Sequence, residues 1–142
     1  KIFMALKYAP FPVVGAPAGG AYGGGVELLL HCDAVQAFSE TYMGLVETNI
    51  GIIPGGGGTQ RLTRMIGLSR ATEVVLLGKM LTVEHARDLG LIHRVFSDEK
   101  FDLQVNEFAK GLSARAPIAM REAKRAIRVG ADECLAPVPC PA

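Results

Sequence analysis

The chain has 142 residues, with 15 Lys and Arg residues against 14 Asp and Glu residues and a formal net charge of +1. This length corresponds to about one domain, and the balanced charge gives no overall field that would favour nucleic acid or an anionic membrane surface. Hydrophobic residues make up 49% of the chain, but its longest apolar runs, such as VELLL, are far too short to span a bilayer.

The front half alternates short apolar segments with glycine-rich turns. A first helix is expected to end before Pro10 and Pro12, because proline interrupts a helix and restricts the residue before it. The β-branched segment PVVGAPA is typical of a buried strand. The predicted elements are helices over residues 1–7 and 26–32 and strands over 12–18, 33–39 and 41–45.

The back half is mostly helical. Thr82 is a predicted N-cap, and Gly90 follows the end of the helix that Thr82 begins. Pro117 opens the last amphipathic helix. The predicted elements are helices over residues 59–69, 70–79, 82–91, 98–116 and 117–131 and a short strand over 92–97. Together the pattern indicates an α/β fold with a parallel-type sheet at the front and a helical back half.

The two ends of the chain and its cysteines complete the outline. The chain begins at Lys1 rather than Met, inside a segment with helical periodicity, so we expect a piece of a longer protein. Residues 132–142 carry three prolines and no periodicity, and we expect them to be disordered. Cys32, Cys134 and Cys140 are odd in number and include no CxxC pair, which favours free thiols in a reducing compartment, the cytoplasm or the mitochondrial matrix.

Gly24 lies where a predicted strand passes into a helix, inside the run AYGGGVELLL. Backbone N–H groups at a helix start have no intrahelical acceptor, and glycine lets a ligand approach them closely. Such a turn can bind a phosphate or an oxygen that becomes negative during a reaction. The phosphate alternative is disfavoured because GGAYGGG lacks the G-x-G-x-x-G spacing and PGGGGTQ lacks the lysine of a P-loop.

Two acids are candidates for proton transfer beside this turn. Glu27 follows Gly24 by three residues, about one helical turn. Glu47 lies in MGLVETNIG, a run with few other polar side chains, where apolar surroundings would disfavour its charged form. The plainer alternative is that Glu27 is a solvated helix residue and Glu47 a capping or surface acid.

Three segments together resemble the central part of the enoyl-CoA hydratase/isomerase (crotonase) family. They are PVVGAPAGGAYGGGVELLLHCD, ETYMGLVETNIGIIPGGGGTQRLTRMIG and LTVEHARDLGLIHRV, and the resemblance covers about residues 11–131. It implies a crotonase-like fold of ββα repeats, with residues 1–131 forming part of one domain. Family members carry an earlier motif with a second oxyanion donor and further C-terminal helices, so we expect a chain truncated at both ends.

The resemblance also implies a mechanism and its residues. Gly24 matches the position whose N–H stabilises the thioester oxygen of an acyl-CoA. Glu27 matches the acid that activates water for attack on the β-carbon, and Glu47 the acid that exchanges the proton at the α-carbon. Gly55 matches a residue whose N–H positions that water. No metal and no separate cofactor are expected, because CoA is part of the substrate.

Hydration of 2-enoyl-CoA, as in fatty-acid β-oxidation, is therefore the preferred function. Double-bond isomerisation is the first alternative, disfavoured because both acids are present. A non-catalytic crotonase-fold module that binds a partner subunit or RNA is the second. The resemblance implies a homo-trimer or hexamer for the parent protein, and similarity to hydratase domains fused to dehydrogenases suggests a multifunctional parent.

Several other polar residues are expected to be structural. His31 and Cys32 are predicted to pack in the core, because no further ligand lies at metal-site spacing. Arg61, Arg64 and the basic segment 121–128 are predicted to lie on solvated helix faces.

Overall fold

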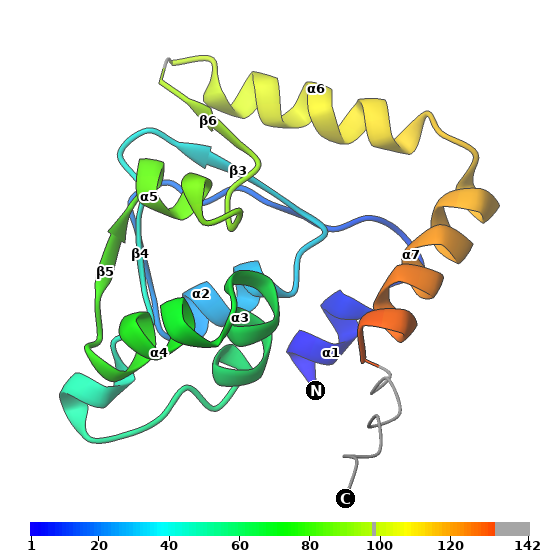
Figure 1. Cartoon of the computed structure of the whole chain (residues 1–142). Coiled ribbons are helices and arrows are strands. Elements are labelled where there is room, and N and C mark those ends of the chain that lie inside the picture. Colours follow the sequence, from blue (N-terminus) through cyan, green and yellow to red (C-terminus); the bar gives the residue numbers. More distant parts are fainter. Residues whose placement is uncertain (98, 133–142) are drawn as a thin grey trace, which may run out of the picture.

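Two three-stranded sheets form the front of the molecule in the computed structural model, which describes residues 1–97 and 99–132 (Figure 1). The first sheet has the order β1-β3-β6, and all of its neighbours are parallel. The second has the order β2-β4-β5, with β2 parallel and β5 antiparallel to β4. The strands are β1 (Val14–Gly15), β2 (Gly20–Tyr22), β3 (Ala34–Phe38), β4 (Tyr42–Gly44), β5 (Met80–Thr82) and β6 (Arg94–Phe96).

Helices pack against these sheets and make up most of the second half of the chain. The elements are α1 (Ile2–Lys7), α2 (Gly24–Leu30), the 3₁₀ helix η1 (Glu47–Ile50), α3 (Gly58–Ile66), α4 (Leu68–Leu76), α5 (Val83–Asp88), α6 (Phe101–Ser113) and α7 (Pro117–Asp132). Figure 1 shows α2, α3 and α4 together on one side of the strands, whereas α6 and α7 extend around the outside. No helix of the described part is both long and apolar enough to cross a bilayer.

The hydrophobic core lies between the strands and the group α2, α3, α4 and α5. Met43, Leu45 and Leu62 are its largest fully buried apolar side chains, and Val26, Leu29 and Leu30 contribute the inner face of α2. By contrast, α6 has no buried residue and α7 has one, Lys124. The two C-terminal helices are thus held to the body largely by contacts other than the main core.

The α/β architecture with a parallel-type sheet and a helical back half is confirmed. Thr82 caps α5, because its Oγ1 accepts a hydrogen bond of 3.3 Å from the backbone N–H of His85. The strands β2 and β5 and the helix η1 were not predicted. β2 lies beside the Gly triplet, which was interpreted as a turn, and β5 lies where two predicted helices meet, over residues 70–79 and 82–91. Of the predicted tail 132–142, Asp132 ends α7, and the other residues lie outside the described part.

Candidate active site

Glu27 lies in the first turn of α2 and is 3% exposed. Its Oε1 accepts two backbone hydrogen bonds, of 2.7 Å from Gly56 N–H and 2.8 Å from Gly58 N–H. A buried carboxylate requires such donors, because burial without partners is costly. Glu27 is therefore a fixed group of the interior, and the interpretation of Glu27 as a solvated helix residue is wrong.

The turn before α3 is glycine-rich because it passes directly over this carboxylate. A Cβ at Gly56 would lie 2.4 Å from Oε2 of Glu27, and a Cβ at Gly58 would lie 3.0 Å from Oε1. Gly57 has a φ of +101°, which non-glycine residues rarely adopt. Three successive glycines thus let the backbone donate to Glu27 at close range.

Glu47 begins η1 and is 7% exposed. Its Oε2 is buried and has no hydrogen-bond partner among residues 1–97 and 99–132. A Cβ at Gly23, the N-cap of α2, would lie 3.0 Å from Oε1 of Glu47. The Glu47 carboxylate therefore lies against the start of α2, with one oxygen free to exchange a proton or bind a water.

Gly24 is the first residue of α2, so its N–H has no acceptor within the helix. Nothing lies within 4 Å of the position that a Cβ would take on Gly24. The residue is exposed, and open space adjoins it. The start of α2 thus combines an accessible backbone with Glu47 beside it and Glu27 one turn later.

Gly55 lies in the same turn and is exposed. The only atom within 4 Å of a Cβ built on Gly55, among the described residues, is the carbonyl oxygen of Ile53 at 3.9 Å, so neither acid adjoins that position. The donors to Glu27 are Gly56 and Gly58, which the sequence analysis did not single out. The only signal was the run of four glycines, and this run does not tell which N–H groups point at an acid 29 and 31 positions earlier.

His31 supports Glu27 from the next turn of α2. Its Nδ1 lies 2.7 Å from the carbonyl oxygen of Glu27, and its ring stacks on Phe3 with centroids 5.3 Å apart. Burial lowers the pKa of His31, so the neutral ring donates its Nδ1–H to that carbonyl. The prediction that His31 and Cys32 pack in the core is confirmed, and burial raises the pKa of the Cys32 thiol.

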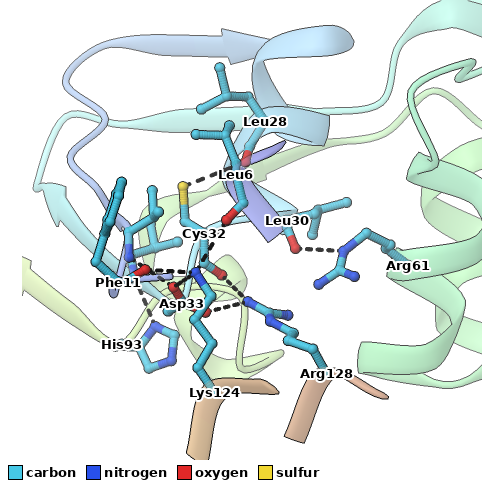
Figure 2. Close-up of polar contacts among 12 residues, drawn as sticks. Leu6, Phe11, Leu28, Leu30, Cys32, Asp33, Arg61, His93, Lys124 and Arg128 are labelled. Carbon is cyan, nitrogen blue, oxygen red and sulfur yellow. Dashed lines mark hydrogen bonds and ion pairs between the residues drawn. The ribbon is translucent and has the colours of Figure 1, made fainter. Parts of the chain in front are cut away.

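The expected solvated basic faces are wrong in part. Arg61 is half-buried, and its Nε donates a hydrogen bond of 2.7 Å to the carbonyl of Leu30. In α7, Lys124 is buried against Asp33 at 2.7 Å, and Arg128 contacts the same carboxylate at 2.8 Å. Figure 2 shows Lys124 and Arg128 converging on Asp33. The helical pattern could not reveal this, since Asp33 is about 90 positions away in the sequence.

Comparison with known proteins identifies one family of relatives. A family model described as enoyl-CoA hydratase/isomerase matches residues 1–137. The chain is 43% identical over 132 residues to an enoyl-CoA isomerase/hydratase of Mycosarcoma maydis, covering 92% of this chain and 48% of that protein. It is 43% identical over 127 residues to the mitochondrial methylglutaconyl-CoA hydratase of Homo sapiens, covering 87% and 38%.

A solved structure, the enoyl-CoA hydratase from Bacillus anthracis, matches with a TM-score of 0.89 and 39% identity, covering 94% of this chain and 52% of that one. A second, an enoyl-CoA hydratase from Polaromonas sp. JS666, gives a TM-score of 0.88 at 31% identity. The chain spans about half the length of the relatives that it matches, or less.

Proposed function

The chain belongs to the enoyl-CoA hydratase/isomerase family, and from this premise we propose that it carries the acid–base groups for hydration of 2-enoyl-CoA thioesters to 3-hydroxyacyl-CoA. One observation carries the proposal. Two buried carboxylates, Glu27 and Glu47, adjoin the start of α2, and one of their oxygens has no partner among the described residues. A buried carboxylate with a purely structural role is expected to have a hydrogen-bond partner for each oxygen.

In this proposal Glu27 activates the attacking water. Its Oε1 is occupied by the N–H groups of Gly56 and Gly58, which leaves Oε2 to take a proton from water. The water oxygen forms a bond to the β-carbon, and the electrons of the double bond move towards the thioester oxygen. Gly55 would help to orient the water through its N–H.

Glu47 completes the addition by giving a proton to the α-carbon from its unpartnered oxygen. One proton is taken up by Glu27 and one is given by Glu47, so the product is the substrate plus one water. Positioned acid–base groups of this kind contribute about 10²–10⁴ in rate. The accessible N–H of Gly24 would stabilise the negative thioester oxygen, and removing such a donor costs about 10²–10³ in rate.

The closest alternative is double-bond isomerisation, which would need only the acid at Glu47. Two N–H groups donate to the carboxylate of Glu27, and Gly56 and Gly58 approach it closely. This fixed second acid favours hydration, because isomerisation would not need it. The substrate in either case is an acyl-CoA thioester, with no separate cofactor. We further propose that the parent protein is a homo-trimer or hexamer.

The test is loss of the conjugated enoyl-thioester absorbance when the chain is mixed with crotonyl-CoA. Glu27→Gln and Glu47→Gln are each expected to lower turnover by at least about 10², while the exposed Glu107→Gln in α6 serves as the matched control. Retained turnover in Glu47→Gln would contradict the assignment. No turnover in the unaltered chain would show that these groups do not suffice by themselves, and would favour a fragment that needs the rest of its parent or a non-catalytic module.

A further inference from the structure

A second concave site lies at the far end of α2, where the chain leaves the helix at Leu30 and reaches Asp33. It is a cleft of about 620 Å³ between the body of the protein and the helices α6 and α7. This volume lies within the range of about 300–1,000 Å³ that is typical of small-molecule sites. None of Glu27, Glu47 and Gly24 lines it, so it is separate from the candidate active site.

The cleft has an excess of positive charge. Five cationic side chains line it, against two carboxylates, Asp33 and Asp132. The cations are Lys7, Arg61, Arg64, Lys124 and Arg128. Both carboxylates are already engaged, since Asp33 contacts Lys124 and Arg128 and Asp132 accepts hydrogen bonds from Lys7 and Tyr8.

Two of the five cations have no carboxylate partner among the described residues. The only hydrogen bond of the Arg61 guanidinium goes to the carbonyl of Leu30, and Arg64 makes no hydrogen bond or ion pair in this part of the chain. Figure 2 shows the guanidinium of Arg61 turned towards that of Arg128. Burial and then repulsion from Arg128 lower the pKa of Arg61, and the attraction of Asp132 opposes this only in part.

Apolar side chains form the remaining wall of the same cleft. They are Leu30, Met65, Phe108, Leu112, Met120 and Ile127. Ile127 is 69% exposed and Met65 is 43% exposed, so part of this wall is open to solvent next to the unpaired guanidinium groups. Exposed apolar surface beside uncompensated charge is the pattern of a site that takes a ligand with a charged end and an apolar body.

We propose that this cleft binds an oxyanion carried on an aliphatic chain, either an alkyl carboxylate or an alkyl phosphate. The head group lies among Arg61, Arg64 and Arg128, where planar guanidinium groups match the geometry of carboxylate and phosphate oxygens. The aliphatic chain lies along the wall formed by Met65, Phe108 and Ile127. The proposal is independent of the hydratase assignment, because the two sites share none of the residues that carry either argument.

The test is isothermal titration calorimetry of the 142-residue chain with sodium decanoate and with decyl phosphate, both below their micelle concentrations. Arg64→Ala is the informative variant, because Arg64 makes no contact that folding needs. It is expected to weaken binding of both ligands by roughly tenfold, the usual effect of losing one charge-assisted hydrogen bond. Arg70→Ala is the matched control, since Arg70 is an exposed arginine of α4 outside the cleft, and it should bind as the unaltered chain does.

Two further ligands and the Arg64→Ala variant decide the case. Decylamine should bind much more weakly than decanoate, and equal binding would overturn the role of the arginines. Inorganic phosphate should also bind much more weakly, and equal binding would overturn the role of the apolar wall. If Arg64→Ala binds decanoate as the unaltered chain does, the ligand lies elsewhere and the proposal fails. The ratio of decanoate to decyl phosphate affinity tells which head group the site prefers.

Discussion

Gly56 lies so close to Glu27 that a Cβ on Gly56 would come within 2.4 Å of Oε2 of Glu27, while its N–H donates to Oε1 at 2.7 Å. The same built Cβ would lie 2.3 Å from the ring edge of Phe3. The absence of a side chain at Gly56 is thus a condition for the hydrogen bond that fixes the carboxylate. The glycine and the acid form one unit, although they are 29 positions apart in the sequence.

Gly56→Ala is expected to displace the Glu27 carboxylate. Phe3 can move, since its ring is the end of a side chain, but the carboxylate would lose its place beside Gly58. We expect a loss of about 1–3 kcal/mol in the free energy of unfolding, as for overpacked sites. Turnover of crotonyl-CoA should fall by about 10², the cost of misplacing a reacting group by about 1 Å.

Gly111→Ala is the control for this substitution. Gly111 lies within α6, and nothing is found within 4 Å of its built Cβ. It should raise the free energy of unfolding by about 0.5–1 kcal/mol, because alanine favours the helix. Equal turnover in Gly56→Ala and Gly111→Ala would contradict the role given to Glu27.

Gly23→Ala tests the contact between the start of α2 and Glu47. Gly23 has a φ of +51°, and its built Cβ would lie 3.0 Å from Oε1 of Glu47. The substitution should cost about 1–3 kcal/mol through backbone strain and should lower turnover by moving Glu47. Gly67→Ala is the matched control, because Gly67 has a φ of +84° with nothing within 4 Å. Gly67→Ala should lose similar stability and keep its turnover. An equal loss of turnover in Gly23→Ala and Gly67→Ala would refute a specific role for Gly23.

Asp33→Asn tests how α7 is attached. Asp33 contacts Lys124 and Arg128 of α7 and accepts a hydrogen bond of 2.8 Å from the backbone N–H of Val13 (Figure 2). Lys124 is 9% exposed and also donates to the carbonyls of Leu6 and Phe11, so neutralising Asp33 leaves a buried charge with hydrogen bonds but without this counter-ion. We expect a loss of about 3 kcal/mol in the free energy of unfolding, at the lower end for buried pairs since Asp33 is partly exposed.

Hydrogen exchange locates the effect of that substitution. Amides of α7 should exchange faster in Asp33→Asn, while those of α3 change less, because α3 is held by core residues such as Leu62. The control is Glu122→Gln, which breaks only the exposed pairs with Arg121 and Arg125 and should change stability by less than about 0.5 kcal/mol. Unchanged exchange in α7 would show that the Asp33 contacts do not hold this helix.

Local patterns in the sequence predict the elements that contain enough residues to show a period, such as α2 from VELLLHC and α7 from the segment after Pro117. They miss β2 because it lies beside the Gly triplet, and β5 because it lies between two helical segments; both strands form by pairing with β4. The family resemblance singles out Glu27 and Glu47, but it does not reveal that Gly56 and Gly58 are the donors to Glu27. That information lies in the close approach of two turns, which depends on the whole fold. The ion pairs of Asp33 could not be predicted for the same reason, because its cationic partners lie in α7.

The stability of the fold should depend on pH through His31. Burial lowers the pKa of His31 below its ordinary value of 6.5, despite the hydrogen bond to the carbonyl of Glu27. The unfolded chain therefore binds more protons than the folded chain below about pH 6.5, and stability must fall as the pH falls through that range. Linkage limits the loss to about 1.4 kcal/mol per pH unit for one proton. Asp132 does not contribute in this window, because its pKa is held below the usual range by hydrogen bonds from Lys7 and Tyr8.

The measurement is the urea midpoint at pH 7.5 and at pH 5.5 for the unaltered chain, for His31→Phe and for His85→Gln. His31→Phe keeps an aromatic ring against Phe3 but cannot take up a proton, so its midpoint should fall less between the two pH values. His85 is exposed in α5, and its substitution should leave the fall as it is in the unaltered chain. If His31→Phe loses as much stability on acidification as the unaltered chain, the buried ring is not the group that couples folding to protons.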